Sequence, residues 1–136
     1  MDLADALEFV RENHYAVLAT TRSDGGAQLS PVAATVDSEG FVVVSSRETA
    51  MKTRNLRKRP RATLCVFQPQ FFGPWRQVEG TVQVVSLPDA MDGLVEYYRS
   101  ISGEHPDWDD YRRAMNDERR VLLRIDVDRA GPDTAG

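Results

Sequence analysis

A run of basic residues without acidic neighbours is the part of this sequence best suited to bind a charged ligand. From Thr49 to Val78 the chain has no Asp or Glu. The same window holds seven of the 17 Lys and Arg residues: Lys52, Arg54, Arg57, Lys58, Arg59, Arg61 and Arg76. The formal net charge of the whole chain is -4, so the window predicts one positive region on an otherwise negative protein. Clustered positive potential attracts phosphates and carboxylates.

Two hydroxyls and a predicted helix accompany these cations. Ser45 and Ser46 end an apolar run, and a helix is expected between Thr49, a suitable N-cap, and Pro60. Its first turns carry Lys52, Arg54 and Asn55. Hydroxyls, helix-start amides and cations together favour a phosphate site. Charge alone leaves two alternatives, a solvated helix face and a contact with a nucleic-acid backbone. The negative net charge and the lack of zinc-finger, RRM or KH signatures argue against nucleic acid.

Composition limits the class of protein. A chain of 136 residues predicts one domain, here 1–130, followed by a flexible tail at 131–136. The N-terminus is acidic and the apolar runs are short, so we expect a cytoplasmic protein without a membrane segment. The single Cys65 lies in an apolar run and is expected to be buried. His14 and His105 lie far apart, which predicts no metal site, and no catalytic pair can be identified.

The polar–apolar pattern predicts a mainly β protein of the α+β class. Short helices are expected at 2–12, 49–60, 88–101 and 108–115, and strands at 15–21, 28–36, 41–46, 61–68, 77–84 and 121–127. Asp24-Gly25-Gly26 suits a tight hairpin turn. Six strands with helices inserted late indicate a small Greek-key barrel.

Three segments resemble the pyridoxamine 5′-phosphate oxidase-like split β-barrel superfamily. They are Phe41–Ser46, Lys52–Ala62 and Trp75–Val82, within a likeness that spans Tyr15–Ser86 and the final strand. The resemblance implies a six-stranded split β-barrel with short flanking helices. It also implies a homodimer that binds a flavin or deazaflavin between its subunits.

The resemblance also implies roles for individual residues. The cofactor phosphate would be held by Ser45, Ser46, Lys52 and Arg54. Gln77 would meet the ring system from the partner strand. The loop before that strand leaves two interpretations open for Phe71, Phe72 and Trp75. Either they cover the end of the barrel or pack a dimer, or Trp75 flanks the cofactor ring while Phe71 and Phe72 line a pocket for a flat acceptor.

The strand before Phe41 bears on the choice of cofactor. FMN-dependent members carry an Arg-x-x-x-Leu-Lys pattern there, and the alignment puts Leu29 and Ala34 at the two charged positions. Ser30, Pro31 and Val32 are instead similar to the branch that uses the deazaflavin coenzyme F-420, as is the Lys-x-Arg-Asn-Leu-Arg run that contains Lys52, Arg54, Asn55 and Arg57. The glutamate tail of that cofactor would take further cations, drawn from Arg57, Lys58, Arg59 and Arg61.

The implied activity is hydride transfer from reduced coenzyme F-420 to an unsaturated small-molecule acceptor, for which biliverdin, a quinone and a nitroaromatic compound remain open. Two alternatives also remain open. The first is an FMN-dependent enzyme of the oxidase or flavin-reductase type, and the second is a non-enzymatic deazaflavin carrier.

Overall fold

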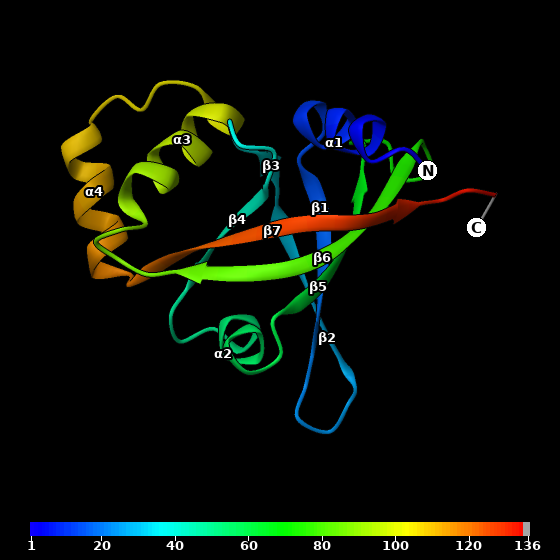
Figure 1. The fold of residues 1–136 in the computed structure, drawn as a ribbon. Coiled ribbons are helices and arrows are strands. Elements are labelled where there is room, and N and C mark those ends of the chain that lie inside the picture. The colour runs from blue at the N-terminus through cyan, green and yellow to red at the C-terminus, as the bar shows by residue number, and fades with distance from the viewer. Residues whose placement is uncertain (135–136) are drawn as a thin grey trace.

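The computed structural model describes residues 1–134 as one antiparallel sheet surrounded by four helices (Figure 1). The elements in chain order are α1 (Leu3–Glu12), β1 (Tyr15–Thr21), β2 (Ala27–Ala33), β3 (Thr35–Val36), β4 (Val42–Arg47), α2 (Met51–Lys58), β5 (Arg61–Phe67), β6 (Trp75–Val85), α3 (Met91–Ser102), α4 (Trp108–Asp117) and β7 (Arg120–Gly131). The strand order in the sheet is β2-β1-β5-β6-β7-β4-β3.

The two edge strands of the sheet are consecutive in the chain. β2 pairs with β1, β3 pairs with β4, and only Ala34 separates them. The amide of Ala34 donates to the His14 carbonyl oxygen at 2.9 Å, which fixes this crossing point. Because both edges meet there, the sheet curls into a split barrel, and the predicted fold class is confirmed. The expected count of six strands is wrong, since the single strand expected at 28–36 is broken at Ala34 into two.

The interior of the curled sheet is a dry apolar core. The fully buried members contributed by strands include Leu18, Val42, Val44, Leu64, Val66, Val78, Leu123 and Ile125, and α1 adds Ala6 and Val10. β6 bends at a register shift between Glu79 and Gly80. A side-chain carbon at Gly80 would collide with the Asp126 carbonyl oxygen, so only glycine allows β6 and β7 to approach this closely.

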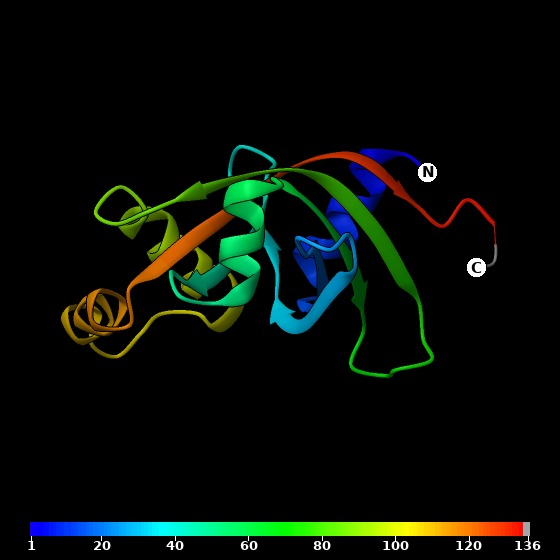
Figure 2. The ribbon, with the colours of Figure 1, turned by 90° about the horizontal axis from the view of Figure 1, so that it is seen from below.

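The two helices after β6 cover a different part of the sheet. α3 and α4 form a second apolar cluster with Val43 and Leu122, beside the curled part of the sheet (Figure 2). Tyr98, Trp108 and Tyr111 pack edge to face there with ring centroids 5.1 to 5.8 Å apart, and His105 joins them. None of the helices within residues 1–134 has the length and apolar character needed to cross a membrane.

Several local predictions differ from the structure. Cys65 is exposed, because alternation along β5 turns it to the outer face while Leu64 and Val66 point inward. Ala50, and not Thr49, is the N-cap of α2. Gly131, expected in the tail, pairs with Gln77 at the end of β7, while positions 135–136 of that tail lie outside the described residues.

Candidate anion-binding site

The start of α2 is fixed against the end of β4 by hydroxyl groups. The Ser46 hydroxyl donates to the Thr53 hydroxyl at 2.8 Å, since the Thr53 hydroxyl itself donates to the Arg47 carbonyl oxygen at 2.6 Å. Ser46 is 1% exposed, so its hydroxyl positions α2 and is not presented to solvent. The N-cap Ala50 supplies no side-chain acceptor and the first turn of α2 has no acid. The first amides of α2 therefore keep their capacity to bind an anion.

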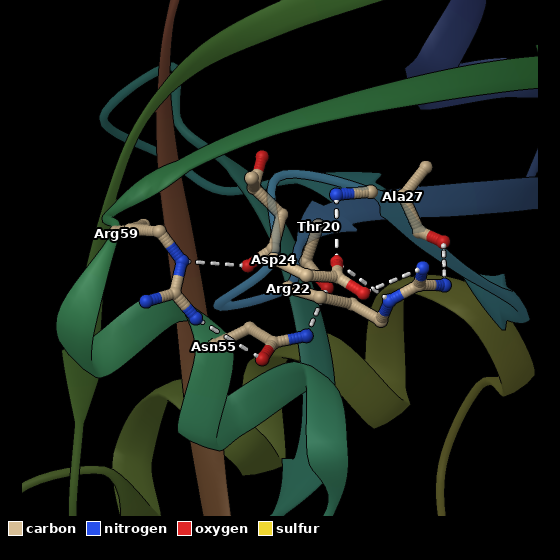
Figure 3. A network of polar contacts seen from close by, with 8 residues as sticks. Thr20, Arg22, Asp24, Ala27, Asn55 and Arg59 are labelled. Atoms are coloured by element: carbon tan, nitrogen blue, oxygen red, sulfur yellow. Dashed lines mark hydrogen bonds and ion pairs between the residues drawn. The ribbon is translucent and has the colours of Figure 1, made fainter.

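A buried polar network holds the other side of α2 (Figure 3). The Asn55 side-chain amide donates to the Thr20 hydroxyl at 3.1 Å, and that hydroxyl donates to the Gln28 side-chain oxygen at 3.1 Å. The Asn55 side-chain oxygen accepts from Arg59 at 3.4 Å, and Arg59 also donates to the Thr21 carbonyl oxygen at 2.8 Å. Asn55 is 4% exposed, so in this structure it ties α2 to the β1–β2 hairpin.

Lys52 is the cation of α2 that most resembles a ligand-binding group. It is half-buried and makes no ion pair with any residue in 1–134. Burial lowers the pKa of the Lys52 ammonium, and the positive charge of Arg120 lowers it further. A bound anion would stabilise the charged form of such a cation most strongly, because it offsets both the loss of solvation and the repulsion from the second cation.

Arg120 reaches this place from the far end of the chain. β4 and β7 pair Arg47 with Arg120, so both guanidinium groups start from the same end of the same face of the sheet. Glu118 accepts from Arg120 at 2.8 Å and from Arg47 at 3.3 Å. One carboxylate thus serves two guanidinium groups, and with Lys52 nearby the cations outnumber the acids.

Ser45 lies on this face and not with Ser46. Neighbouring residues of a strand point to opposite faces, and Ser45 is paired with Leu122, which packs against α3 and α4. The anion-binding candidates that the protomer brings together are therefore Ser45, Lys52 and Arg120, next to the start of α2.

The remaining basic residues divide into paired and unpaired ones. Arg57 donates to both oxygens of Glu48 at 2.7 Å and to the Ser86 hydroxyl at 2.9 Å. Arg61 pairs with Asp128 at 2.7 Å, and Arg59 belongs to the Asn55 network. Arg54 and Lys58 are exposed and make no ion pair within residues 1–134. A role for Arg57 or Arg54 toward a ligand stays a prediction.

The other predicted site residues lie elsewhere on the protomer. Pro31 and Gln77 belong to one row across the outer face of β2, β1, β5 and β6, and Trp75 belongs to the next row. Ser30 and Val32 alternate with Pro31 and point inward, where the Ser30 hydroxyl is buried without a hydrogen-bond partner. Such an orphaned hydroxyl is rare in a folded protein.

Within one protomer, Gln77 lies well along β6 from the place where α2 ends. Thr81 pairs with Arg61, directly after α2, and Gln77 lies four residues away along β6. At about 3.4 Å per residue, this separates Gln77 from the α2 end of the strand by about 14 Å.

Sequence reasoning missed Arg120 and Tyr97. Arg120 is distant in sequence and reaches the site only through the β4–β7 register. Tyr97, on α3, donates its hydroxyl to the Ala33 carbonyl oxygen at 2.8 Å. Burial raises the pKa of Tyr97, and the Ser45 backbone and Arg120 oppose that rise. The one sequence signal for a further cation beside the site is Arg47, which directly follows Ser45 and Ser46.

Comparison with known proteins agrees with this fold. The sequence model of the family described as pyridoxamine 5′-phosphate oxidase matches residues 4–131. The chain belongs to the pyridoxamine 5′-phosphate oxidase family. Family members bind flavin or deazaflavin cofactors.

Three solved structures show the same fold. The conserved hypothetical protein Rv2991 from Mycobacterium tuberculosis is 25% identical with a TM-score of 0.76, over 96% of this chain and 82% of that one. An F-420 reductase is 20% identical with a TM-score of 0.68, over 91% and 94%. A nimC/nimA family protein from Clostridium acetobutylicum is 20% identical with a TM-score of 0.65, over 90% and 81%.

Proposed function

We propose that this family member is an oxidoreductase that uses coenzyme F-420, with the cofactor phosphate bound by Ser45, Lys52 and Arg120 at the start of α2. The observation that carries the proposal is Lys52, a half-buried cation without an acidic partner in residues 1–134, whose pKa is lowered by burial and by Arg120. When bound, the reduced deazaflavin supplies a hydride. The protein has to orient the ring and the acceptor and exclude water.

The donor set at the start of α2 fits a phosphate group. A phosphodiester or phosphomonoester accepts several charge-assisted hydrogen bonds, and Lys52 and Arg120 are charged donors. The Ser45 hydroxyl and the uncapped amides of α2 add neutral donors.

Two positions support the deazaflavin over FMN. Leu29 and Ala34 take the places of the Arg and Lys of the FMN-dependent pattern. Leu29 is 62% exposed on the outer face and Ala34 is fully buried at the crossing point between β2 and β3. Neither side chain can pair with a phosphate, and a buried charge at Ala34 would be costly.

A homodimer is part of the proposal. The outer face of β2, β1 and β5, with the loop between β5 and β6, exposes large apolar side chains: Tyr15 at 55%, Leu29 at 62%, Phe71 at 69% and Phe72 at 94%. Contiguous exposed apolar surface of this kind marks an interaction site. We assign a second copy of the chain as its occupant, because Gln77 and Trp75 lie on this face and a second copy would bring them to the α2 site. Light scattering tests this directly, and a monomer at micromolar concentration would contradict it.

The test of the function is a titration followed by a turnover assay. Calorimetry with coenzyme F-420 and, separately, with FMN should give binding of the deazaflavin and at least tenfold weaker binding of FMN, about 1.4 kcal/mol. Oxidation of the reduced cofactor in the presence of biliverdin, a quinone or a nitroaromatic compound should then identify the acceptor class. Binding without oxidation of the cofactor by any of these acceptors would favour a non-enzymatic carrier.

An FMN-dependent enzyme is the second candidate, because the matching family model is named for pyridoxamine 5′-phosphate oxidase. Preference for FMN in the titration would select it, and binding of neither cofactor would refute both.

A further inference from the structure

A tyrosine hydroxyl lies in the split between β2 and β4. β3 pairs with β4 in a register that, continued by two residues, places Ala33 opposite Ser45. These two residues do not pair, because β2 has turned toward β1 and Ala33 pairs with Tyr15. The Tyr97 hydroxyl donates to the Ala33 carbonyl oxygen at 2.8 Å, at the place where the ladder between β2 and β4 would have continued.

Ser45 forms the other side of the split, because the register places it directly across from Ala33. The nearby Ser45 backbone and Arg120 oppose the rise that burial causes in the pKa of Tyr97. The Tyr97 hydroxyl therefore satisfies the Ala33 carbonyl oxygen at the place where the sheet opens, beside Ser45. Buried backbone groups without partners are costly, so this hydroxyl stabilises an opening that the strands alone would leave unsatisfied.

α3 is attached across the split at a second point. The Ser100 hydroxyl lies 2.9 Å from the Thr35 hydroxyl, so α3 contacts both β2 and β3. The neighbouring Tyr98 differs. Its ring packs against Trp108 and Tyr111 in the second apolar cluster, and its hydroxyl makes no hydrogen bond within residues 1–134.

We infer that Tyr97 is a positioning residue for the anion site. Its hydroxyl holds the β2 segment at Ala33, directly across the split from Ser45, and so sets the width of the opening beside which Ser45 is presented to the ligand. This inference rests on the proposed function, since the ligand whose affinity reports on the site is the one assigned there. α3, which lies outside the segments that resemble the family, then helps to position the ligand-binding residues.

The test compares Tyr97→Phe with Tyr98→Phe, two removals of one hydroxyl at adjacent positions of α3. Calorimetry with coenzyme F-420 should show about tenfold weaker binding for Tyr97→Phe, the loss expected for one hydrogen bond, and no change for Tyr98→Phe. Amide hydrogen exchange of the ligand-free protein should show faster exchange at Ser45 in Tyr97→Phe only. Core amides such as that of Leu64 should keep the wild-type rate in both variants, which separates a local effect from general destabilisation.

The readouts separate two kinds of failure. Unchanged or slower exchange at Ser45 in Tyr97→Phe would overturn the inference, and so would faster exchange with unchanged affinity. If the wild-type protein binds no deazaflavin, the proposed function fails. The exchange comparison then still decides whether Tyr97 keeps the backbone ordered on the Ser45 side of the split.

Discussion

Replacement of Lys52 by methionine should separate binding from stability. In the folded protein burial and Arg120 disfavour the charged form of Lys52, so its pKa lies below the ordinary value of 10.5. A lowered folded-state pKa means that the charge works against folding at neutral pH, and that this penalty fades as the pH rises through the folded-state pKa. Lys52→Met keeps most of the aliphatic packing and removes the charge. The ligand-free variant should therefore be at least as stable as the wild type at pH 7.

Binding should respond in the opposite direction. A hydrogen bond to a charged group contributes about 1.5–3 kcal/mol, so Lys52→Met should weaken binding of coenzyme F-420 by a factor of roughly 10 to 150. Calorimetry gives the affinity and thermal unfolding gives the stability of the same preparations. Arg112→Met is the control, since it likewise replaces a helical cation by methionine, but at an exposed position of α4, and Arg112 makes no ion pair within residues 1–134. Lower stability with unchanged affinity would refute the assignment of Lys52 to the phosphate.

Three further predictions concern the scaffold that holds the site. Asn55→Ala should lower the free energy of unfolding by about 1–3 kcal/mol, because it removes one hydrogen-bond partner each from Thr20 and Arg59 in a buried network. An unfolding free energy within error of the wild type in urea melts would contradict the network. Gly80→Ala should destabilise by about 3 kcal/mol or more, or prevent folding, because its side chain collides with Asp126; recovery of protein with the wild-type unfolding midpoint would contradict this. Burial raises the pKa of Tyr111 to about 12, so the stability due to its protonated form should be complete below about pH 10 and fall as the pH approaches 12. In urea melts, Tyr111→Phe should lose less stability than the wild type over this pH range. Identical dependence of the unfolding free energy on alkaline pH in the two proteins would count against a buried Tyr111.

The fold could be predicted from the sequence where the pattern is local. Alternation along β1, β5 and β6 fixed which residues face the core, and the turn at Asp24-Gly25-Gly26 joined the first hairpin as expected. The break at Ala34 could not be predicted, because Val32–Val36 contains no Gly, Pro or charged residue that would mark an interruption of the strand. Cys65 was misplaced for a related reason, since an apolar run gives no sign of which face is covered.

The site could be predicted only in part. The basic window correctly located α2, and its assignment of Lys52 to a ligand stays a prediction. Sequence could not show that Ser45 and Ser46 point to opposite faces of β4. It also could not show which cations already have partners, because Glu48 and Asp128 reach Arg57 and Arg61 from outside the window. Arg120 and Tyr97 enter through the β4–β7 register and the placement of α3, both of which depend on tertiary structure.

A crystal structure of the protein with coenzyme F-420 would test the central claim most directly. The account predicts the cofactor phosphate at the start of α2, within hydrogen-bond distance of Lys52 and Arg120 of one subunit. It also predicts the ring against Gln77 and Trp75 of a second subunit that covers the outer face of β2, β1 and β5. A phosphate bound away from Lys52, or a ring held within one isolated subunit, would contradict it.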